Sequence, residues 1–292
     1  MKSDWKIRLP QYSYELNAAN STLSISPCAW TKGSLDCVLD NQEYLNLLEH
    51  AISEIRNGKT SKIVLSRIIP SSHKHVDDSV VLLFQQKFPF SCAFYIPRTE
   101  EEIWFGATPE LLLEGKDGVW KTRSIAGTRV MNSNMPWGEK EFSEQSLVTE
   151  GIIEALHAGN AKNILVGDQY TFQSGSIEHI CSDIQFEFTG DVEKIIRFIH
   201  PTAAVLGKPR DLSQKWLVEN EPHNREWYTG TFQVEHQNSI YVYVFLRCGK
   251  ASANGIQWYV GGGLTAESVA QDELQETMNK ANSLEQVLSS QT

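Results

Sequence analysis

The stretch Lys62–Ile69, KIVLSRII, is rich in branched aliphatic residues and is closed by Pro70. It is too short for a typical buried helix, and its composition is that of a strand. Similar β-rich runs recur along the 292-residue sequence, with helical patterns between them and few clean βαβ alternations. We therefore predict an α+β fold of large, mostly antiparallel β-sheets with helices packed outside.

Hydrophobic periodicity on both sides of this stretch predicts the remaining elements. Helices are expected over residues 41–57, 76–88, 138–157, 191–199, 211–219 and 268–288, the last with Ser268 and Gln271 at capping-box spacing. Strands are expected over residues 92–96, 103–107, 111–114, 119–128, 163–166, 176–188, 230–235, 239–248 and 256–260. Residues 1–40 are expected to be an irregular segment of a single domain that spans residues 1–292.

Composition narrows the class of partner. The net charge of −10 argues against nucleic acid, which requires a basic surface. No apolar run approaches the roughly 18 residues that a membrane span needs, and the N-terminus lacks the apolar core of a signal peptide. The five cysteines are widely spaced and form no CxxC pair, which is typical of reduced thiols. We predict a cytoplasmic protein that binds a small molecule, with no nucleic-acid or membrane partner.

Three charged residues interrupt apolar faces. Lys62 begins an apolar strand face, where it either reaches solvent or is desolvated and acts as a base. Glu144 heads an apolar helical row, where it either interacts with the helix dipole or is compensated by a cation. Arg247 continues an aromatic strand face and either stacks at the surface or binds a carboxylate.

Two further features lie near the C-terminus. Glu273, Glu276 and Lys280 share one face of the last predicted helix, with the spacing of a salt bridge between Glu276 and Lys280. Before this helix, the glycines at 261–263 are predicted to form a turn between a strand and the helix. Such a turn either only reverses the chain or exposes N–H groups to an anion.

Nine segments, taken in order over residues 40–290, carry a family resemblance. They are SKIVLSR (61–67), GATPELLLEG (106–115), SIAGTR (124–129), EKEFSEQSLVTEGI (139–152), SIEHICSDI (176–184), HPTAAVLGKPR (200–210), EPHNREWYTG (221–230), YVFLRCGKA (243–251) and GGGLTAES with DELQETMNK (261–280). Together they resemble the chorismate-utilising enzymes, which include isochorismate, salicylate, anthranilate and aminodeoxychorismate synthases.

The resemblance implies roles for individual residues. Lys62 corresponds to the general base that activates water, and Glu110 to the acid that protonates the departing C4 hydroxyl. The resemblance further implies Mg²⁺, a hard cation held by the carboxylates of Glu144, Glu276 and Glu273. The implied substrate-binding residues are Ala126, Gly127, Thr128, His200, Tyr228, Arg247, Gly261, Gly263 and Lys280.

The branch of the family follows from a few positions. Aminodeoxychorismate synthases carry a lysine where this chain has Ala126, and the segments HPTAAVLGKPR and REWYTG favour the isochorismate and salicylate branch. We predict Mg²⁺-dependent conversion of chorismate to isochorismate, for menaquinone or siderophore biosynthesis. A salicylate synthase, an ammonia-using enzyme like anthranilate synthase and a non-catalytic chorismate-binding protein remain alternatives.

The sequence also departs from the family pattern. The usual TRPRG is replaced by TRVMNSNMPWG at residues 128–138, and Gln145 stands where the family has a histidine beside the metal-binding glutamate. These departures leave the implied acid, base and carboxylates in place.

Overall fold

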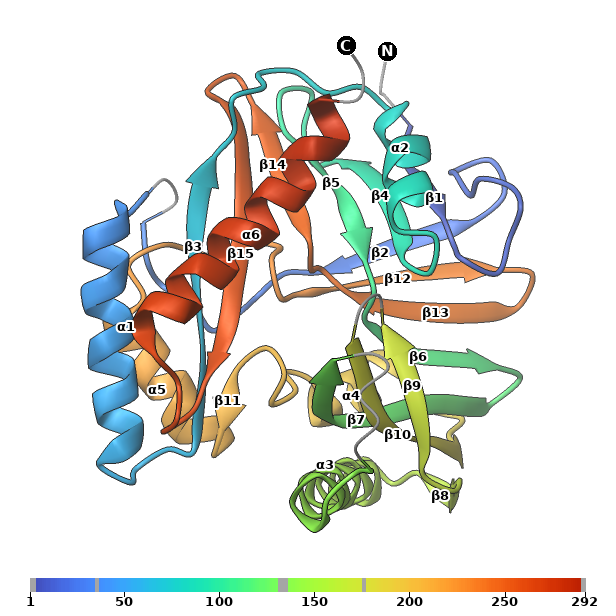
Figure 1. Cartoon of the computed structure of the whole chain (residues 1–292). Coiled ribbons are helices and arrows are strands. Elements are labelled where there is room, and N and C mark those ends of the chain that lie inside the picture. Colours follow the sequence, from blue (N-terminus) through green and yellow to red (C-terminus); the bar gives the residue numbers. More distant parts are fainter. Residues whose placement is uncertain (1–3, 35–36, 131–135, 175–176, 290–292) are drawn as a thin grey trace. The chain divides into compact units, whose positions relative to one another are not determined.

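The computed structural model describes residues 4–34, 37–130, 136–174 and 177–289, and within them it confirms the α+β class (Figure 1). The helices are α1 (Asn41–Arg56), α2 (Val80–Lys87), α3 (Glu139–Ala158), α4 (Val192–Ile199), α5 (Arg210–Asn220) and α6 (Ala270–Ser289). The strands are β1 (Lys6–Arg8), β2 (Thr22–Ser26), β3 (Lys62–Pro70), β4 (Cys92–Pro97), β5 (Ile103–Thr108), β6 (Leu111–Lys116), β7 (Val119–Val130), β8 (Lys162–Val166), β9 (Tyr170–Ser174), β10 (Ile177–Glu187), β11 (Gly207–Lys208), β12 (Thr231–His236), β13 (Ser239–Val244), β14 (Cys248–Ser252) and β15 (Gly255–Leu264).

The chain divides into two compact units. The first comprises Met1–Glu110, Pro201–His236 and Tyr243–Thr292, and the second comprises Leu111–His200 and Gln237–Val242. The single catalytic domain over residues 1–292 stays a prediction.

A seven-stranded sheet lies in the first unit. Its strand order is β1-β4-β5-β14-β15-β3-β11, and its pairs are antiparallel, as predicted. The ladder between β3 and β15 runs from Pro70 opposite Gln257 to Ile63 opposite Leu264. The glycines at 261–263 are therefore part of β15, and the predicted turn there is wrong. A run of three glycines has little strand propensity of its own, so pairing with β3 decides its conformation.

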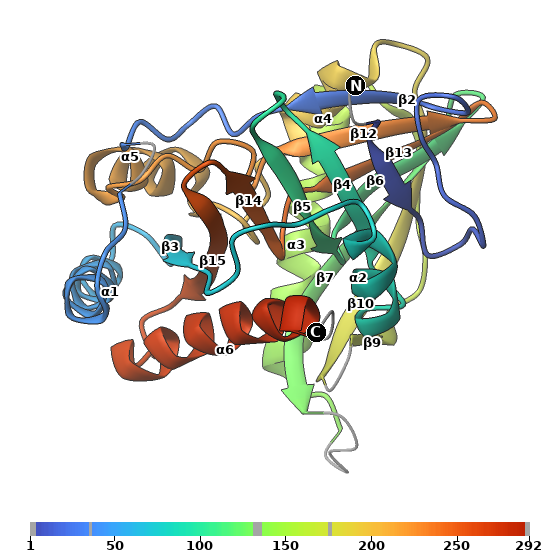
Figure 2. The ribbon, with the colours of Figure 1, turned by 90° about the horizontal axis from the view of Figure 1, so that it is seen from above.

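Helices α2 and α6 pack on this sheet (Figures 1 and 2). Phe84 of α2 and Leu284 of α6 join one buried cluster with Trp258 of β15. A second cluster contains Ile63 and Leu65 of β3 and residues of α1 and α5. Because side chains alternate along a strand, Ile63 and Leu65 leave Lys62, Val64 and Ser66 on the opposite face of β3.

In the second unit, β6, β7, β10 and β8 are adjacent in this order, and β9 pairs with β10. Helix α3 packs on β7 through Gln145 and Thr149, which are both buried. The apolar row predicted to begin at Glu144 is not the buried face, because Leu147 in that row is 54% exposed. The side of α3 that faces β7 carries Gln145 and Thr149, and both form hydrogen bonds with Ser124 of β7. Hydrophobic periodicity does not detect such polar contacts.

Several local predictions are wrong. Residues 1–40 contain β1 and β2, which are short strands fixed by pairing with β4 and β12, and β9, β11 and β14 lie where no strand was predicted. The strand predicted over 239–248 ends at Val244, and Arg247 has a positive φ of 46°. The expected capping box is replaced, because the Ser268 hydroxyl accepts the Thr265 N–H and donates to Glu273.

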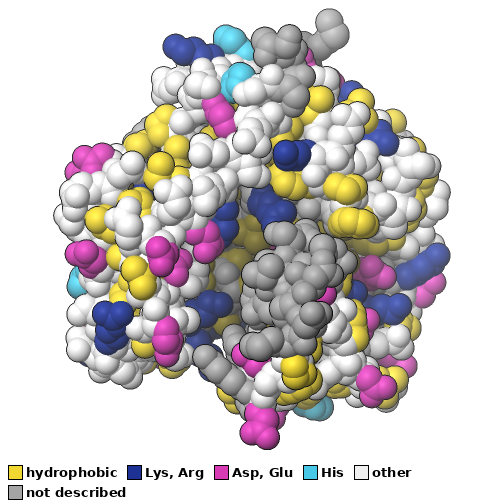
Figure 3. All heavy atoms as spheres, viewed as in Figure 1, with side chains coloured by type: hydrophobic (Ala, Val, Ile, Leu, Met, Phe, Trp, Pro, Cys, Tyr) yellow, Lys and Arg dark blue, Asp and Glu magenta, His cyan; other side chains and the backbone are white. Residues whose placement is uncertain are grey.

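Two further observations concern the charge of the surface and the apolar content of the helices. On the face in Figure 3, basic and acidic side chains of the described residues are interspersed and do not form one continuous basic surface. Within the described ranges, no helix has both the length and the apolar content needed to cross a bilayer. The predicted absence of nucleic-acid and membrane partners stays a prediction, as does the cytoplasmic location.

Candidate active site

Lys62 is the first residue of β3 and is half-buried. Its backbone carbonyl accepts a hydrogen bond from the Ser213 hydroxyl at 2.9 Å. A Cβ atom placed on Gly263 would lie 2.8 Å from Cε of Lys62. The end of the Lys62 side chain therefore lies in space that a side chain at 263 would fill, so a larger residue there would displace the ammonium.

Glu110 follows β5 at the end of the first segment of this unit. Its N–H donates to the Thr108 hydroxyl at 3.2 Å, and its carbonyl accepts the Val244 N–H at 3.0 Å. Burial raises the pKa of the Glu110 carboxyl, and the positive charge of Lys62 opposes this rise only in part. A carboxyl with a raised pKa keeps its proton to higher pH, which is what a general acid requires.

A cavity of about 500 Å³ opens in the first unit. It is lined by Val64, Phe88, Pro109, Ala204, Val205, Tyr228, Thr229, Leu246, Arg247, Tyr259, Val260, Gly261, Gly262, Gly263, Glu276, Asn279, Lys280, Ser283 and Leu284. Its volume suits a small organic ligand, and its lining joins apolar and aromatic walls to a few charged groups. Five of the predicted site residues, Tyr228, Arg247, Gly261, Gly263 and Lys280, meet here, together with Glu276.

Arg247 supplies a cation to this cavity. Its guanidinium lies over the Phe88 ring, 5.6 Å from the ring centroid. Among the residues that the structure describes, no carboxylate forms an ion pair with Arg247, and desolvation lowers the pKa of its guanidinium. A partly desolvated arginine without an acidic partner is suited to binding an anionic ligand, such as a carboxylate.

Glu273 and Glu276 flank the backbone of Gly262 at the edge of the cavity. A Cβ atom on Gly262 would lie 3.1 Å from Glu273 Oε2 and 3.7 Å from Glu276 Oε1. Lys280 forms the predicted salt bridge with Glu276 at 2.6 Å and also donates to the Gly261 carbonyl at 2.7 Å. Burial raises the pKa of Glu273, and the charge of Glu276 contributes to the rise.

These two carboxylates fit a divalent cation. A cation between them would relieve the repulsion that raises the pKa of Glu273, and Mg²⁺ prefers carboxylate oxygens while retaining several waters. Among the described side chains, no group of three or more His, Cys, Asp or Glu residues is arranged to hold a metal. The side chain of Glu144, the third predicted ligand, lies outside the described residues. The metal site therefore stays a prediction.

The remaining predicted residues belong to the second unit. Ala126 is half-buried on β7 opposite Ile180, and a register shift in β10 follows at His179, whose ring donates to the Gly127 carbonyl. Gly127 has a φ of 66°, which glycine adopts without strain. His200 is buried after α4, and its N–H donates to the Ile196 carbonyl. The side chain of Thr128 lies outside the described residues.

Sequence reasoning gave no role to two buried polar groups. Gln145, noted only as a departure from the family, donates to Ser124, Thr149 and Ser182 at 2.9, 3.0 and 3.2 Å. Glu221 and Arg225 form a fully buried ion pair in the first unit. The charges of this pair inside the aromatic segment EPHNREWYTG were the signal that could have drawn attention to it.

Residues 2–286 of the sequence match the family of chorismate binding enzymes. The chain belongs to this family. Its resemblance in nine segments is thus confirmed, and the match extends over the residues of both units. The roles of individual residues stay predictions.

Two of the relatives that the sequence matches are named isochorismate synthases. Isochorismate synthase MenF of Escherichia coli is 28% identical over 263 residues, which cover 85% of this chain and 61% of the relative. Isochorismate synthase DhbC of Bacillus subtilis is 26% identical over 266 residues, which cover 83% of this chain and 67% of the relative. The chain therefore spans 67% of the length of the B. subtilis relative and 61% of the length of the E. coli relative, which is less than two thirds.

Solved structures agree on the fold. The E. coli MenF structure is similar with a TM-score of 0.77 and 26% identity, and the match covers 91% of this chain and 65% of that one. Anthranilate synthase component I from Streptococcus pneumoniae is similar with a TM-score of 0.74 and 20% identity, covering 90% and 59%. Proteins with different names in the family share this fold, so the fold alone does not select the reaction.

Proposed function

We propose that the protein converts chorismate to isochorismate in a Mg²⁺-dependent reaction. The observation that carries the proposal is the electrostatic coupling of Lys62 to Glu110, whose carboxyl has a raised pKa. A base and a protonated acid are the two groups that this isomerisation needs, because the attacking water must lose a proton and the departing hydroxyl must gain one. The names of the relatives MenF and DhbC support the same reaction.

In the proposed mechanism, Lys62 acts in its neutral form and accepts a proton from the water that adds at C2 of chorismate. The ring double bonds shift, the C4–O bond breaks, and Glu110 delivers its proton to the departing hydroxyl, so that one water enters and one leaves. Arg247 and Tyr228 hold a substrate carboxylate at the cavity wall. Glu273 and Glu276 would hold Mg²⁺, which supplies positive charge to neutralise a substrate carboxylate.

The direct test is incubation of the protein with chorismate and Mg²⁺, followed by chromatography of the products. Isochorismate is the expected product. Salicylate, detected by its fluorescence, or an aminated product that requires glutamine or ammonia would replace the proposal with another reaction of the family. Binding of chorismate, seen as thermal stabilisation without any product, would indicate a non-catalytic role.

Lys62→Ala tests the base. We expect a loss of turnover of about 10²- to 10⁴-fold, because a general base contributes that much. Lys208→Ala is the matched control, since Lys208 lies directly opposite Lys62 on β11 and is exposed. Equal activities for the two variants would remove Lys62 from the mechanism.

A further inference from the structure

One edge of β3 is covered by a strand only at its start. The two-residue strand β11 pairs with β3 at Lys62 and Ile63. At Val64 the N–H donates to the carbonyl of Leu206, the residue before β11, at 3.0 Å, which adds one hydrogen bond past the end of this strand pair. The next polar groups of this edge are buried and need other partners, because an unsatisfied buried backbone group is costly.

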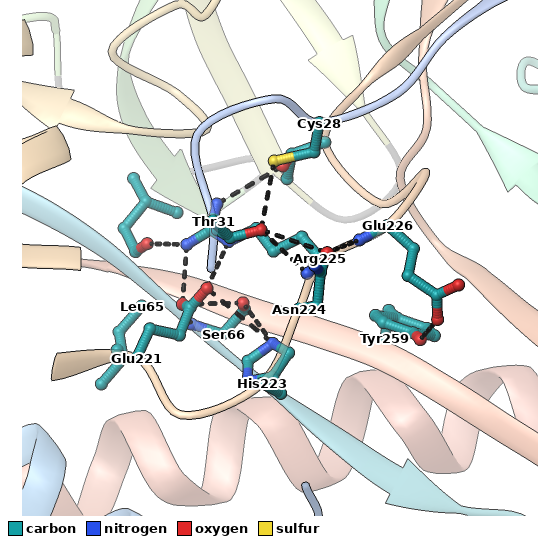
Figure 4. Close-up of polar contacts among 12 residues, drawn as sticks. Cys28, Thr31, Leu65, Ser66, Glu221, His223, Asn224, Arg225, Glu226 and Tyr259 are labelled. Atoms are coloured by element: carbon teal, nitrogen blue, oxygen red, sulfur yellow. Dashed lines mark hydrogen bonds and ion pairs between the residues drawn. The ribbon is translucent and has the colours of Figure 1, made fainter. Parts of the chain in front are cut away.

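An ion pair provides those partners. Arg225 donates from Nη2 to the Val64 carbonyl at 2.6 Å. Glu221 accepts the Ser66 N–H and hydroxyl, each at 2.9 Å (Figure 4). Arg225 also donates to both oxygens of Glu221, at 2.6 and 2.8 Å. Both side chains are 0% exposed. Burial alone would raise the pKa of Glu221, but Arg225 and His223 lower it, so the carboxylate stays charged.

The same guanidinium reaches three segments of the cavity wall. Besides Val64, it donates from Nη1 to the Val205 carbonyl at 2.8 Å and to the Thr229 hydroxyl at 3.4 Å. Val64, Val205 and Thr229 all line the cavity, whereas Arg225 and Glu221 do not. Only arginine has enough donors, in a rigid plane, to bind a carboxylate and three further acceptors at once.

We propose that Arg225, held by Glu221, is a positioning residue that fixes the cavity wall beside Lys62 and Tyr228 without touching the ligand. This inference rests on the proposed function for its kinetic consequence. Val64 lies two residues after Lys62, and Thr229 directly follows Tyr228. Displacement of these segments would misplace the base and the carboxylate-binding group together.

Arg225→Lys keeps the positive charge but removes the planar set of donors. We expect kcat for chorismate to fall about 10- to 100-fold in the folded variant, since misplacement of about 1 Å can cost this much. Arg67→Lys is the matched control. Arg67 lies on β3 and is buried, as Arg225 is, but its partners Asn41 and Thr277 are outside the cavity lining. Both variants are assayed at the same interval below their own melting temperatures.

Hydrogen exchange gives a readout that does not depend on turnover. In Arg225→Lys, we expect faster exchange in the peptides that contain Val64, Val205 and Thr229, and no such change in Arg67→Lys. Glu221→Gln retains the shape of the pair and is used in the same way if Arg225→Lys does not fold. Equal kcat for the Arg225 and Arg67 variants, or unchanged exchange at the three wall segments, would overturn the inference. Absence of product with the wild type would overturn the proposed function instead, and exchange would still decide the positioning role.

Discussion

Two carboxyls of the first unit differ in the direction of their pKa shifts. For Glu221, burial is outweighed by Arg225, His223 and hydrogen bonds, and the pKa falls. For Glu110, burial is opposed only by Lys62, and the pKa rises. A buried carboxylate with a full set of donors serves the fold, whereas one with too few donors is available for proton transfer.

The same contrast holds along α6. Glu285 receives hydrogen bonds from Ser71, Ser72 and Trp258, while Glu273 has the Ser268 hydroxyl and the repulsive charge of Glu276. One end of the helix therefore anchors to the sheet, and the other presents a pair of carboxylates that a cation would stabilise.

Glu110→Gln gives the largest expected effect. We expect turnover of chorismate to fall by about 10²- to 10⁴-fold, because the amide cannot donate the proton, with little change in melting temperature. Glu221→Gln should lower the melting temperature, since it weakens a buried ion pair, and should lower turnover only by the smaller factor of about 10- to 100-fold expected from a displaced cavity wall. Steady-state kinetics and thermal unfolding of both variants test this. A stable, active Glu110→Gln protein would break the comparison.

Glu273→Gln and Glu276→Gln should each raise the Mg²⁺ concentration for half-maximal activity. A rise of about 10- to 100-fold is expected, as for other residues that support a metal. A titration of activity against Mg²⁺ measures it, with Glu285→Gln on the same helix as the control. If the control shifts as much as the two variants, Glu273 and Glu276 do not hold the metal.

The raised pKa of Glu110 predicts the alkaline limb of the pH profile. The acid must be protonated, so activity is present below the folded-state pKa and declines as pH rises through it. Because that pKa lies above the ordinary 4.5, the decline should begin at higher pH than for an exposed glutamate. The profile of kcat/KM against pH measures it, and a profile that is unchanged in Glu110→Asp would assign the limb to another group.

The smallest effect is expected at Glu285. Burial would raise its pKa, but hydrogen bonds from Ser72, Ser71 and Trp258 lower it to about 2 from 4.5. The stabilisation is therefore complete above 4.5 and is lost as pH falls toward 2. Glu285→Gln should lower the melting temperature by a few degrees near neutral pH, as about 1 kcal/mol does, and the difference from wild type should shrink in acid. A constant difference at all pH values would contradict this.

The sequence predicts the elements with strong local patterns. Strand β3 and helix α1 are found where aliphatic composition and helical spacing place them. Strands β1, β2, β9, β11 and β14 were not predicted because they are short, and β1, β2 and β11 also depend on partners distant in sequence. The glycines at 261–263 were assigned to a turn for the same reason.

For the candidate site, the family motifs identify residues, and local spacing predicts the salt bridge between Glu276 and Lys280. The opposite pKa shifts of Glu110 and Glu221 could not be predicted, because they depend on which donors the fold brings to each carboxyl. The wall contacts of Arg225 likewise join Val64, Val205 and Thr229, which are far apart along the chain.

The contact between Gly263 and Lys62 makes the conformation of the lysine depend on the residue at 263. An alanine at 263 would place its methyl against Cε of Lys62, so the lysine could remain only by swinging its ammonium elsewhere. Because Cε lies near the free end of a flexible side chain, the fold would tolerate that alanine, and the position of the ammonium would change. The lack of a side chain beyond hydrogen at Gly263 therefore helps to set the position of the Lys62 ammonium.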